Sequence, residues 1–178
     1  KIGENKIQEA EKKFLNFKDR KKIQLHLIGN LQTNKVKKAV KIFDTIQTAS
    51  RKKTIDKIDS ESQKINKIQK IYLQINISKD PKKGGVKERE IKNFCQHIKT
   101  KKNILLIGVM TILKQNITQT TTKKLYKKTK KIQEQIKKTI PTCKEISMGM
   151  SKDYKIALSQ GATEVRIGTA LFGDRKND

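Results

Sequence analysis

Short apolar runs alternate with longer segments of helical period along the whole chain. In the longer segments, apolar residues recur every three or four positions, as on one face of a helix. The predicted strands are Lys1–Asn5, Gln24–Ile28, Ile42–Gln47, Ile71–Ile77, Ile104–Met110, Glu145–Met148 and Thr163–Ile167. The predicted helices are Lys6–Lys18, a helix capped by Thr33 that runs to Val40, a helix capped by Ser50 that includes Ile55, Ile58, Ile65 and Ile68, then Ile91–Ile98, Thr120–Lys138, Lys152–Gln160 and Ala170–Phe172.

Each predicted strand is followed by a predicted helix, with no hairpin signal between strands. Such alternation is typical of a parallel sheet covered by helices. The apolar runs Ile71–Ile77 and Ile104–Met110 fit strands buried on both faces. A (β/α)₈ barrel needs eight βα units, and this pattern supplies seven. The fold class expected is therefore α/β, a (β/α)₈ TIM-type barrel that lacks one unit.

The stretch Ser147–Gly173 concentrates the polar and glycine residues that form turns. Ser151 stands where an N-cap is expected, and Gly161 where a helix ends. Two helix starts, after Gly149 and at Gly168, would then follow the ends of two successive strands. Unpaired N–H groups at helix starts attract anions, above all phosphate. The pattern thus fits a phosphate site, or simply two ordinary turns.

The same stretch, S-M-G-M-S-x-D followed by V-R-I-G-T-A-L-F-G, resembles the C-terminal signature of the pyridoxal-phosphate homeostasis proteins, relatives of the alanine racemase N-terminal barrel. Further matching motifs are G-E-N at Gly3–Asn5, H-L-I-G-N-L-Q-T-N-K at His26–Lys35, Q-I-N-I-S at Gln74–Ser78 and G-V-M-T-I at Gly108–Ile112. The resemblance implies one cofactor-binding barrel domain over residues 1–178. In that family the first strand and helix precede G-E-N, so the resemblance also implies that the absent unit is the first one and the chain is truncated at its N-terminus.

The resemblance implies pyridoxal 5′-phosphate (PLP) as the cofactor. The residues that it would place at the phosphate are Ser147, Gly149, Met150, Ser151, Gly168 and Thr169. Arg166 would face the pyridine nitrogen, where a cation keeps that nitrogen unprotonated and weakens the ring as an electron sink. The alternative for Arg166 is a salt bridge at a strand end.

Four more residues are candidates near the cofactor, each with a purely structural alternative. His26 lies in the family's H-x-I-G motif, but it also alternates with apolar residues as a core histidine would. Asn5 and Asn76 are either hydrogen-bonding partners of the ring or turn formers at strand ends. Met110 packs against the ring or belongs to the core. Asp153 suits the first turn of a helix and needs no catalytic role.

By resemblance the protein binds PLP and passes it on, with PLP-dependent apoenzymes as the expected recipients, and catalyses no reaction. The family's Schiff-base lysine lies upstream of G-E-N, and neither Lys79 nor Lys152 occupies its position. The rival on the same barrel is a PLP-dependent racemase or decarboxylase, which would need a second domain for its other acid–base group. A remnant of a decaying gene is a further alternative.

The formal charge of +26 makes a basic nucleic-acid-binding protein an alternative interpretation. Only five of the 43 basic residues are arginines, aromatic residues are few, and the lysines are spread over every predicted helix. Base-reading surfaces favour arginine and stacked aromatics, so we expect a merely basic surface without specific nucleic-acid binding.

The remaining composition excludes other classes of site. Two cysteines 48 positions apart and two histidines form no metal-ligand spacing, so no metal is expected. The longest apolar run, Ile104–Met110, is too short to span a bilayer. We expect a soluble, cytoplasmic monomer without membrane contact.

Overall fold

The computed structural model describes residues 1–81 and 83–173, in which seven parallel strands pair in sequence order. The strands are β1 (Ile2–Glu4), β2 (Leu25–Leu27), β3 (Thr45–Ala49), β4 (Gln69–Gln74), β5 (Ile104–Met110), β6 (Glu145–Met150) and β7 (Glu164–Arg166). The helices are α1 (Ile7–Phe14), α2 (Val36–Ile42), α3 (Lys52–Gln63), α4 (Ile91–Lys99), α5 (Gln119–Thr139), α6 (Tyr154–Ser159) and α7 (Thr169–Phe172), with 3₁₀ turns η1 (Arg20–Lys22), η2 (Thr33–Lys35) and η3 (Glu88–Glu90). This confirms the α/β barrel one unit short of eight.

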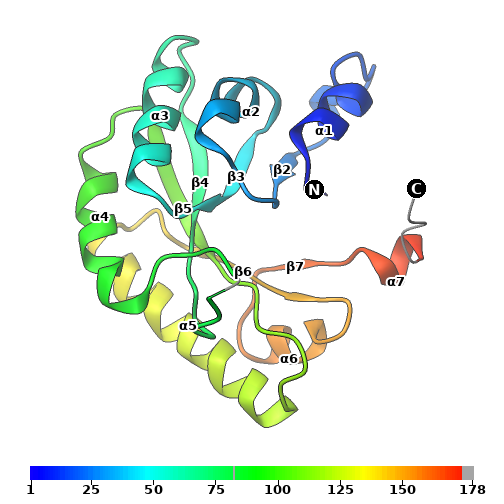
Figure 1. Cartoon of the computed structure of the whole chain (residues 1–178), viewed down its shortest axis with the longest axis vertical. Coiled ribbons are helices and arrows are strands. Elements are labelled where there is room, and N and C mark those ends of the chain that lie inside the picture. The colour runs from blue at the N-terminus through cyan, green and yellow to red at the C-terminus, as the bar shows by residue number, and fades with distance from the viewer. Residues whose placement is uncertain (82, 174–178) are drawn as a thin grey trace.

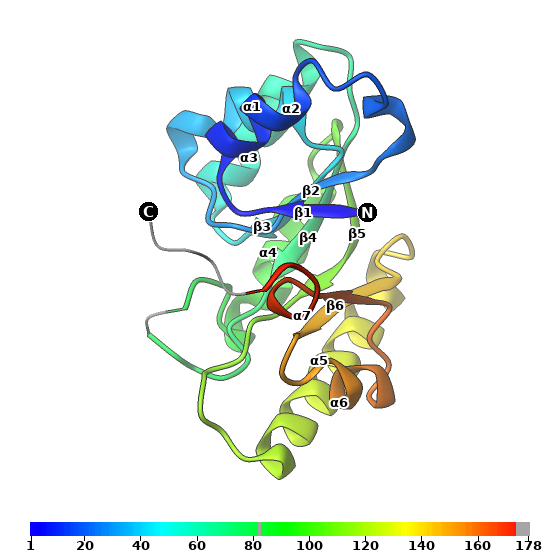
Figure 2. The ribbon, with the colours of Figure 1, turned by 90° about the vertical axis from the view of Figure 1, so that its right-hand side faces the viewer.

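The sheet curls into a nearly closed barrel whose open side lies between β1 and β7. Helices α1 to α6 follow one another around its outer surface (Figure 1). Figure 2 faces the open side, with β1 above and α7 below. Among the described residues, no main-chain pairing joins β1 to β7. An ion pair of 2.7 Å between Lys1 Nζ and Glu164 Oε2 bridges the two edges instead.

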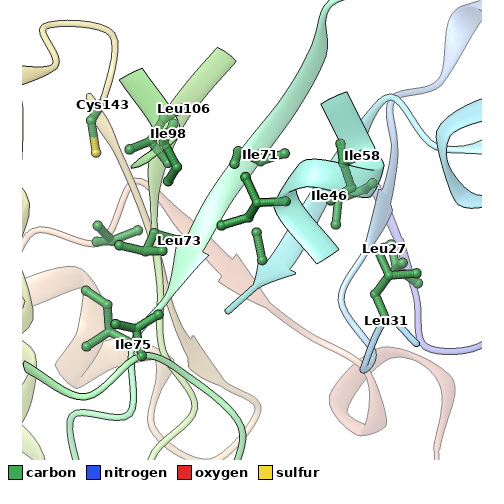
Figure 3. Packing of buried hydrophobic residues seen from close by; sticks show 14 of the residues in the cluster. Leu27, Leu31, Ile46, Ile58, Ile71, Leu73, Ile75, Ile98, Leu106 and Cys143 are labelled. Atoms are coloured by element: carbon green, nitrogen blue, oxygen red, sulfur yellow. The ribbon is translucent and has the colours of Figure 1, made fainter. Parts of the chain in front are cut away.

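The hydrophobic core lies between the sheet and its helices. Ile46 of β3 packs towards α3, and Ile71 and Leu73 of β4 fill the space beside them (Figure 3). These side chains are fully buried. Each fully buried side chain of this size contributes about 1.5–3 kcal/mol, so the apolar outer face of the strands contributes much of the stability of the fold. The inner face carries several polar residues.

Several predicted boundaries were wrong. β3 begins at Thr45, not at Ile42, because Ile42 ends α2. The helix after Ser50 ends at Gln63, and Ile65 and Ile68 beyond it are 41% and 55% exposed. In a chain that uses isoleucine this freely, the spacing of isoleucines overestimates the length of a helix.

Two predicted caps were also wrong. Arg51, not Ser50, precedes α3, and no side chain caps that helix. Thr33 lies inside η2, and its Oγ1 is 3.3 Å from Oγ1 of Thr54, to which it is hydrogen-bonded.

Within residues 1–81 and 83–173, no helix is long and apolar enough to cross a membrane. The same residues include no cluster of three or more potential metal ligands. Cys95 and Cys143 are both buried and are not joined in a disulfide.

Candidate functional site

The inner face of the barrel carries a chain of hydrogen-bonded polar side chains from four strands. Gln47 of β3 lies at its centre, with its amide fully buried. The Gln47 amide nitrogen is 2.8 Å from His26 Nδ1 on β2, and it also donates to Glu164 Oε1 on β7. Ser147 of β6 donates its hydroxyl to Gln47 Oε1 at 2.7 Å. Residues from distant parts of the sequence thus form one network.

Arg166 is the last member of this network and lies at the carboxyl end of β7. Its Nη1 donates to Ser147 Oγ at 2.7 Å, and its Nη2 donates to the carbonyl oxygen of Thr111, also at 2.7 Å. Burial lowers the pKa of Arg166, against the opposing effect of the nearby Tyr126, Glu164 and Asp153. The group is still a cation at neutral pH, since an arginine pKa starts above 12. It therefore places a fixed positive charge beside Thr111 and Ser147.

Glu164 carries the balancing negative charge. Burial acts to raise its pKa, but hydrogen bonds and charge from His26 and Lys1 outweigh burial and lower the pKa to about 2. Its carboxylate is thus ionised at any physiological pH. Glu164 and Arg166 are two positions apart on β7, so both side chains point to the inner face of the sheet.

The pKa of Glu164 predicts how stability depends on pH. A carboxylate with a lowered folded-state pKa stabilises the fold above its unfolded pKa of about 4.5, and this contribution is lost as pH falls towards 2. The two values bound the contribution at about 3 kcal/mol. We expect Glu164→Gln to remove much of the loss of unfolding free energy between pH 4.5 and 2, measured by urea denaturation. An acid profile unchanged by the substitution would contradict the ion-paired role of Glu164.

The turn after β6 is held by a buried tyrosine and an aspartate. β6 was predicted to end at Met148 but extends to Met150, so Gly149 lies in the last part of the strand, just before the turn. Gly149 adopts φ +93°, and a Cβ there would lie 2.5 Å from Cβ of Ala157. Asp153 accepts a hydrogen bond from the main-chain N–H of Met150 at 2.7 Å and another from the hydroxyl of Tyr126 at 2.6 Å. Only glycine fits at position 149. Asp153 fixes the path of the main chain over the two residues that follow Gly149.

This turn brings Ser151 to the start of α7. Ser151 is not the N-cap of α6, as the sequence suggested; Asp153 occupies that position. The Ser151 hydroxyl instead accepts from the main-chain N–H groups of Gly168 and Ala170, at 3.3 and 3.4 Å. These are long for N–H···O bonds. A Cβ added to Gly168 would meet no atom within 4 Å, so space is open beside these donors.

A phosphate ester needs hydrogen-bond donors and room beside them. This place offers a hydroxyl, two N–H groups whose present hydrogen bonds are long, and open space. The residues present therefore fit the phosphate of PLP. Thr169, the first residue of α7, lies between the two N–H donors. Ser151, Gly168 and Thr169 are thus brought together as the sequence predicted.

The other candidates are placed differently. Ser147 lies inside the barrel, bonded to Arg166 and Gln47. Asn76 uses its amide within its own loop: it donates to the carbonyls of Asp80 and Lys83 and accepts from the N–H of Asp80. Asn76 is accordingly a turn former. Asn5 is exposed, Met110 is fully buried and Met150 is 44% exposed.

A cavity of about 570 Å³ opens at the other end of the barrel, where the strands begin. Its lysines are Lys1, Lys21, Lys67, Lys70 and Lys144. Lys67 donates to the carbonyls of Val40 and Phe43 at the end of α2. Burial lowers its pKa to about 8. Parallel barrels place their ligands at the carboxyl ends of the strands, so this cavity lies opposite the candidate site.

This arrangement of strands, with its polar site at their carboxyl ends, defines a barrel of the alanine racemase N-terminal type. The family model "Alanine racemase, N-terminal domain" matches residues 1–176. An alanine racemase from Clostridium difficile has a similar fold, with a TM-score of 0.77 at 13% identity over 99% of this chain and 45% of that one. At that identity the likeness concerns the fold alone.

Within this class the relatives are more specific. The chain is 34% identical to the pyridoxal phosphate homeostasis protein of Aquifex aeolicus, over 98% of this chain and 76% of the relative. It matches PipY of Synechococcus elongatus, solved without PLP, with a TM-score of 0.91 at 31% identity, over 96% of this chain and 80% of PipY. PipY with PLP bound gives a TM-score of 0.85. The chain belongs to the pyridoxal phosphate homeostasis protein family.

Proposed function

We propose that this chain binds PLP at the carboxyl ends of β6 and β7 and acts as a carrier of the cofactor rather than as an enzyme. The observation that carries the proposal is the convergence of Ser151 on the N–H groups at the start of α7, with Arg166 at the end of the neighbouring strand β7. A relative solved with PLP bound, PipY, has the same fold. PLP would supply an aldehyde that reacts with amines.

In this proposal the site has two ends. Ser151, Gly168 and Thr169 hold the phosphate through a hydroxyl and main-chain N–H groups, with Gly149 and Met150 shaping the turn. Arg166 faces the pyridine ring, held by Ser147 and Thr111, and His26 and Met110 line the barrel near it. Asn5 and Asn76 contribute by forming the loops at the rim rather than by touching the ring.

We expect binding without a specific covalent lysine. Lys79 and Lys152 lie at the rim with exposed side chains, outside the polar interior. Charge-assisted hydrogen bonds contribute about 1.5–3 kcal/mol each. Several of them sustain an affinity of roughly 1 μM, about −8 kcal/mol, after the costs of association.

The proposal is tested by equilibrium dialysis of the chain against PLP, followed by borohydride reduction and peptide mapping. We expect one PLP per chain, displaced by inorganic phosphate, with scattered labelling of lysines at low yield. Stoichiometric labelling of one lysine, such as Lys79 or Lys152, would contradict the non-covalent account. Turnover of alanine, serine or lysine in a racemisation assay would contradict the carrier role.

A further inference from the structure

The orientation of the Gln47 amide is dictated by its partners in the interior network. Its side chain is fully buried and hydrogen-bonded at both ends of the amide. Glu164 is ionised and can only accept, so the NH₂ group of Gln47 must face it. The carbonyl of Gln47 must then face Ser147. A reversed amide would place its oxygen against the Glu164 carboxylate and would be repelled.

This orientation passes along the network to Arg166. The Ser147 hydroxyl has one proton, which it gives to Gln47 Oε1 at 2.7 Å. Its lone pairs are then left for Arg166 Nη1, which approaches to 2.7 Å. The Gln47 amide nitrogen also lies 2.8 Å from His26 Nδ1. Along the path from Arg166 through Ser147 and Gln47 to Glu164, each donor thus meets an acceptor.

We propose that Gln47 is a positioning residue, which fixes Arg166 for the pyridine end of PLP by orienting Ser147. The inference rests on the proposed PLP-binding function and adds a residue to its site. Gln47 acts through Ser147 and touches no part of the phosphate site around Ser151. Replacing Gln47 should therefore weaken the binding of PLP but leave the binding of inorganic phosphate unchanged.

The charged and titratable groups around Gln47 come from several elements. His26 on β2 and Glu164 on β7 contact it directly, Lys1 pairs with Glu164, and Arg166 on β7 is joined to it through Ser147. Tyr72 on β4 and Glu145 on β6 interact electrostatically in the same region, since Glu164 and Glu145 both raise the pKa of Tyr72 after burial. Glu164 is the nearest acid. A glutamate at position 47 would place a second carboxylate against it, and two such carboxylates share a proton because both cannot ionise at close range.

This predicts a pH-dependent variant. In Gln47→Glu the side chain keeps its shape. When protonated, it can donate to Glu164 and accept from Ser147, as the amide does. Gln47→Met keeps the volume but can do neither. We expect Gln47→Met to bind PLP about tenfold more weakly than the wild type at every pH. At pH 8.5, Gln47→Glu should bind PLP as weakly as Gln47→Met does. At pH 5.5, its PLP affinity should be within about threefold of the wild-type affinity.

The measurement is the ratio of variant to wild-type PLP dissociation constants at matched pH, which cancels the titration of PLP itself. Inorganic phosphate is titrated as the second probe. Gln133→Glu is the matched control: Gln133 is also buried and donates to the carbonyl of Cys143 at 2.5 Å, on the outer side of the sheet. A carboxylate there should leave the PLP ratio flat with pH. Circular dichroism checks that each variant is folded.

The outcomes separate the two proposals. A wild-type chain that does not bind PLP refutes the proposed function, and the positioning role with it. A wild type that binds, with Gln47→Glu showing the same deficit at both pH values or none at all, refutes the positioning role alone. If the Gln47 variants do not fold, Ser147→Ala cuts the same network next to Arg166 and should weaken PLP binding about tenfold. An unchanged affinity would overturn the inference.

Discussion

Gly149→Ala is expected to lower the free energy of unfolding by about 2–4 kcal/mol and PLP affinity by tenfold or more. Positive φ costs a residue with a Cβ about 1–3 kcal/mol, and Gly149 has φ +93°. The new methyl would also lie 2.5 Å from Cβ of Ala157 and 3.1 Å from Cα of Tyr154. Because these are packed groups of α6, the turn itself would have to move, and Ser151 would leave the start of α7. Denaturant unfolding and PLP titration measure both effects.

Gly161→Ala provides the matched control. Gly161 also has positive φ, +87°, but an added Cβ meets only the end of the flexible Lys130 side chain, at 2.8 Å. The cost should be about 1 kcal/mol, with PLP affinity unchanged. Equal effects of the two substitutions on PLP affinity would show that the turn after β6 does not form the site.

Arg166→Met is expected to weaken PLP binding by about 10- to 100-fold, because one charge-assisted hydrogen bond contributes about 1.5–3 kcal/mol. Methionine keeps much of the length of the side chain but donates nothing to Ser147, Thr111 or the cofactor. Affinity for inorganic phosphate should stay within about threefold of the wild type, since the phosphate donors lie on Ser151 and the α7 main chain.

Arg20→Met is the control for loss of an arginine. Like Arg166, Arg20 makes two hydrogen bonds, here to the main-chain carbonyls of Ile23 and Ile42. Its Nη2 also forms an ion pair with Asp44 Oδ2 at 2.9 Å. It lies at the amino end of the strands, away from the candidate site. We expect a loss of stability without a change in PLP affinity. If Arg166→Met and Arg20→Met reduce PLP affinity alike, the role given to Arg166 at the ring is wrong.

The fold was predictable because the strands are apolar where the helices cover them. β5 was predicted at its observed bounds, Ile104–Met110, since it is an uninterrupted apolar run ending at a polar residue. β3 was not, because Thr45, Gln47 and Thr48 are polar residues in a buried strand. The hydrophobic pattern predicts a barrel strand from its apolar outer face. Where the inner face is polar, the apolar run is interrupted and the bounds of the strand cannot be predicted from it.

The candidate site was predictable in its motifs and not in its contacts. Ser151, Gly168 and Arg166 lie in a recognisable stretch, and the structure brings the first two together. Gln47 and Glu164 carry no local motif, and only the closure of the barrel places them side by side. The roles of Tyr126 and Asp153 likewise depend on how α5 packs against the turn after β6. Such pairs are separated by tens of residues, so spacing along one chain cannot reveal them.

The most direct test is a crystal structure of the chain with PLP bound. The account predicts the phosphate within hydrogen-bonding distance of Ser151 Oγ and the main-chain N–H of Thr169, with the pyridine ring beside Arg166. The lysine-lined cavity at the amino end of the strands is the contrasting location, since its cations would attract the same anion. PLP found there, with the space beside Gly168 empty, would contradict the proposed site.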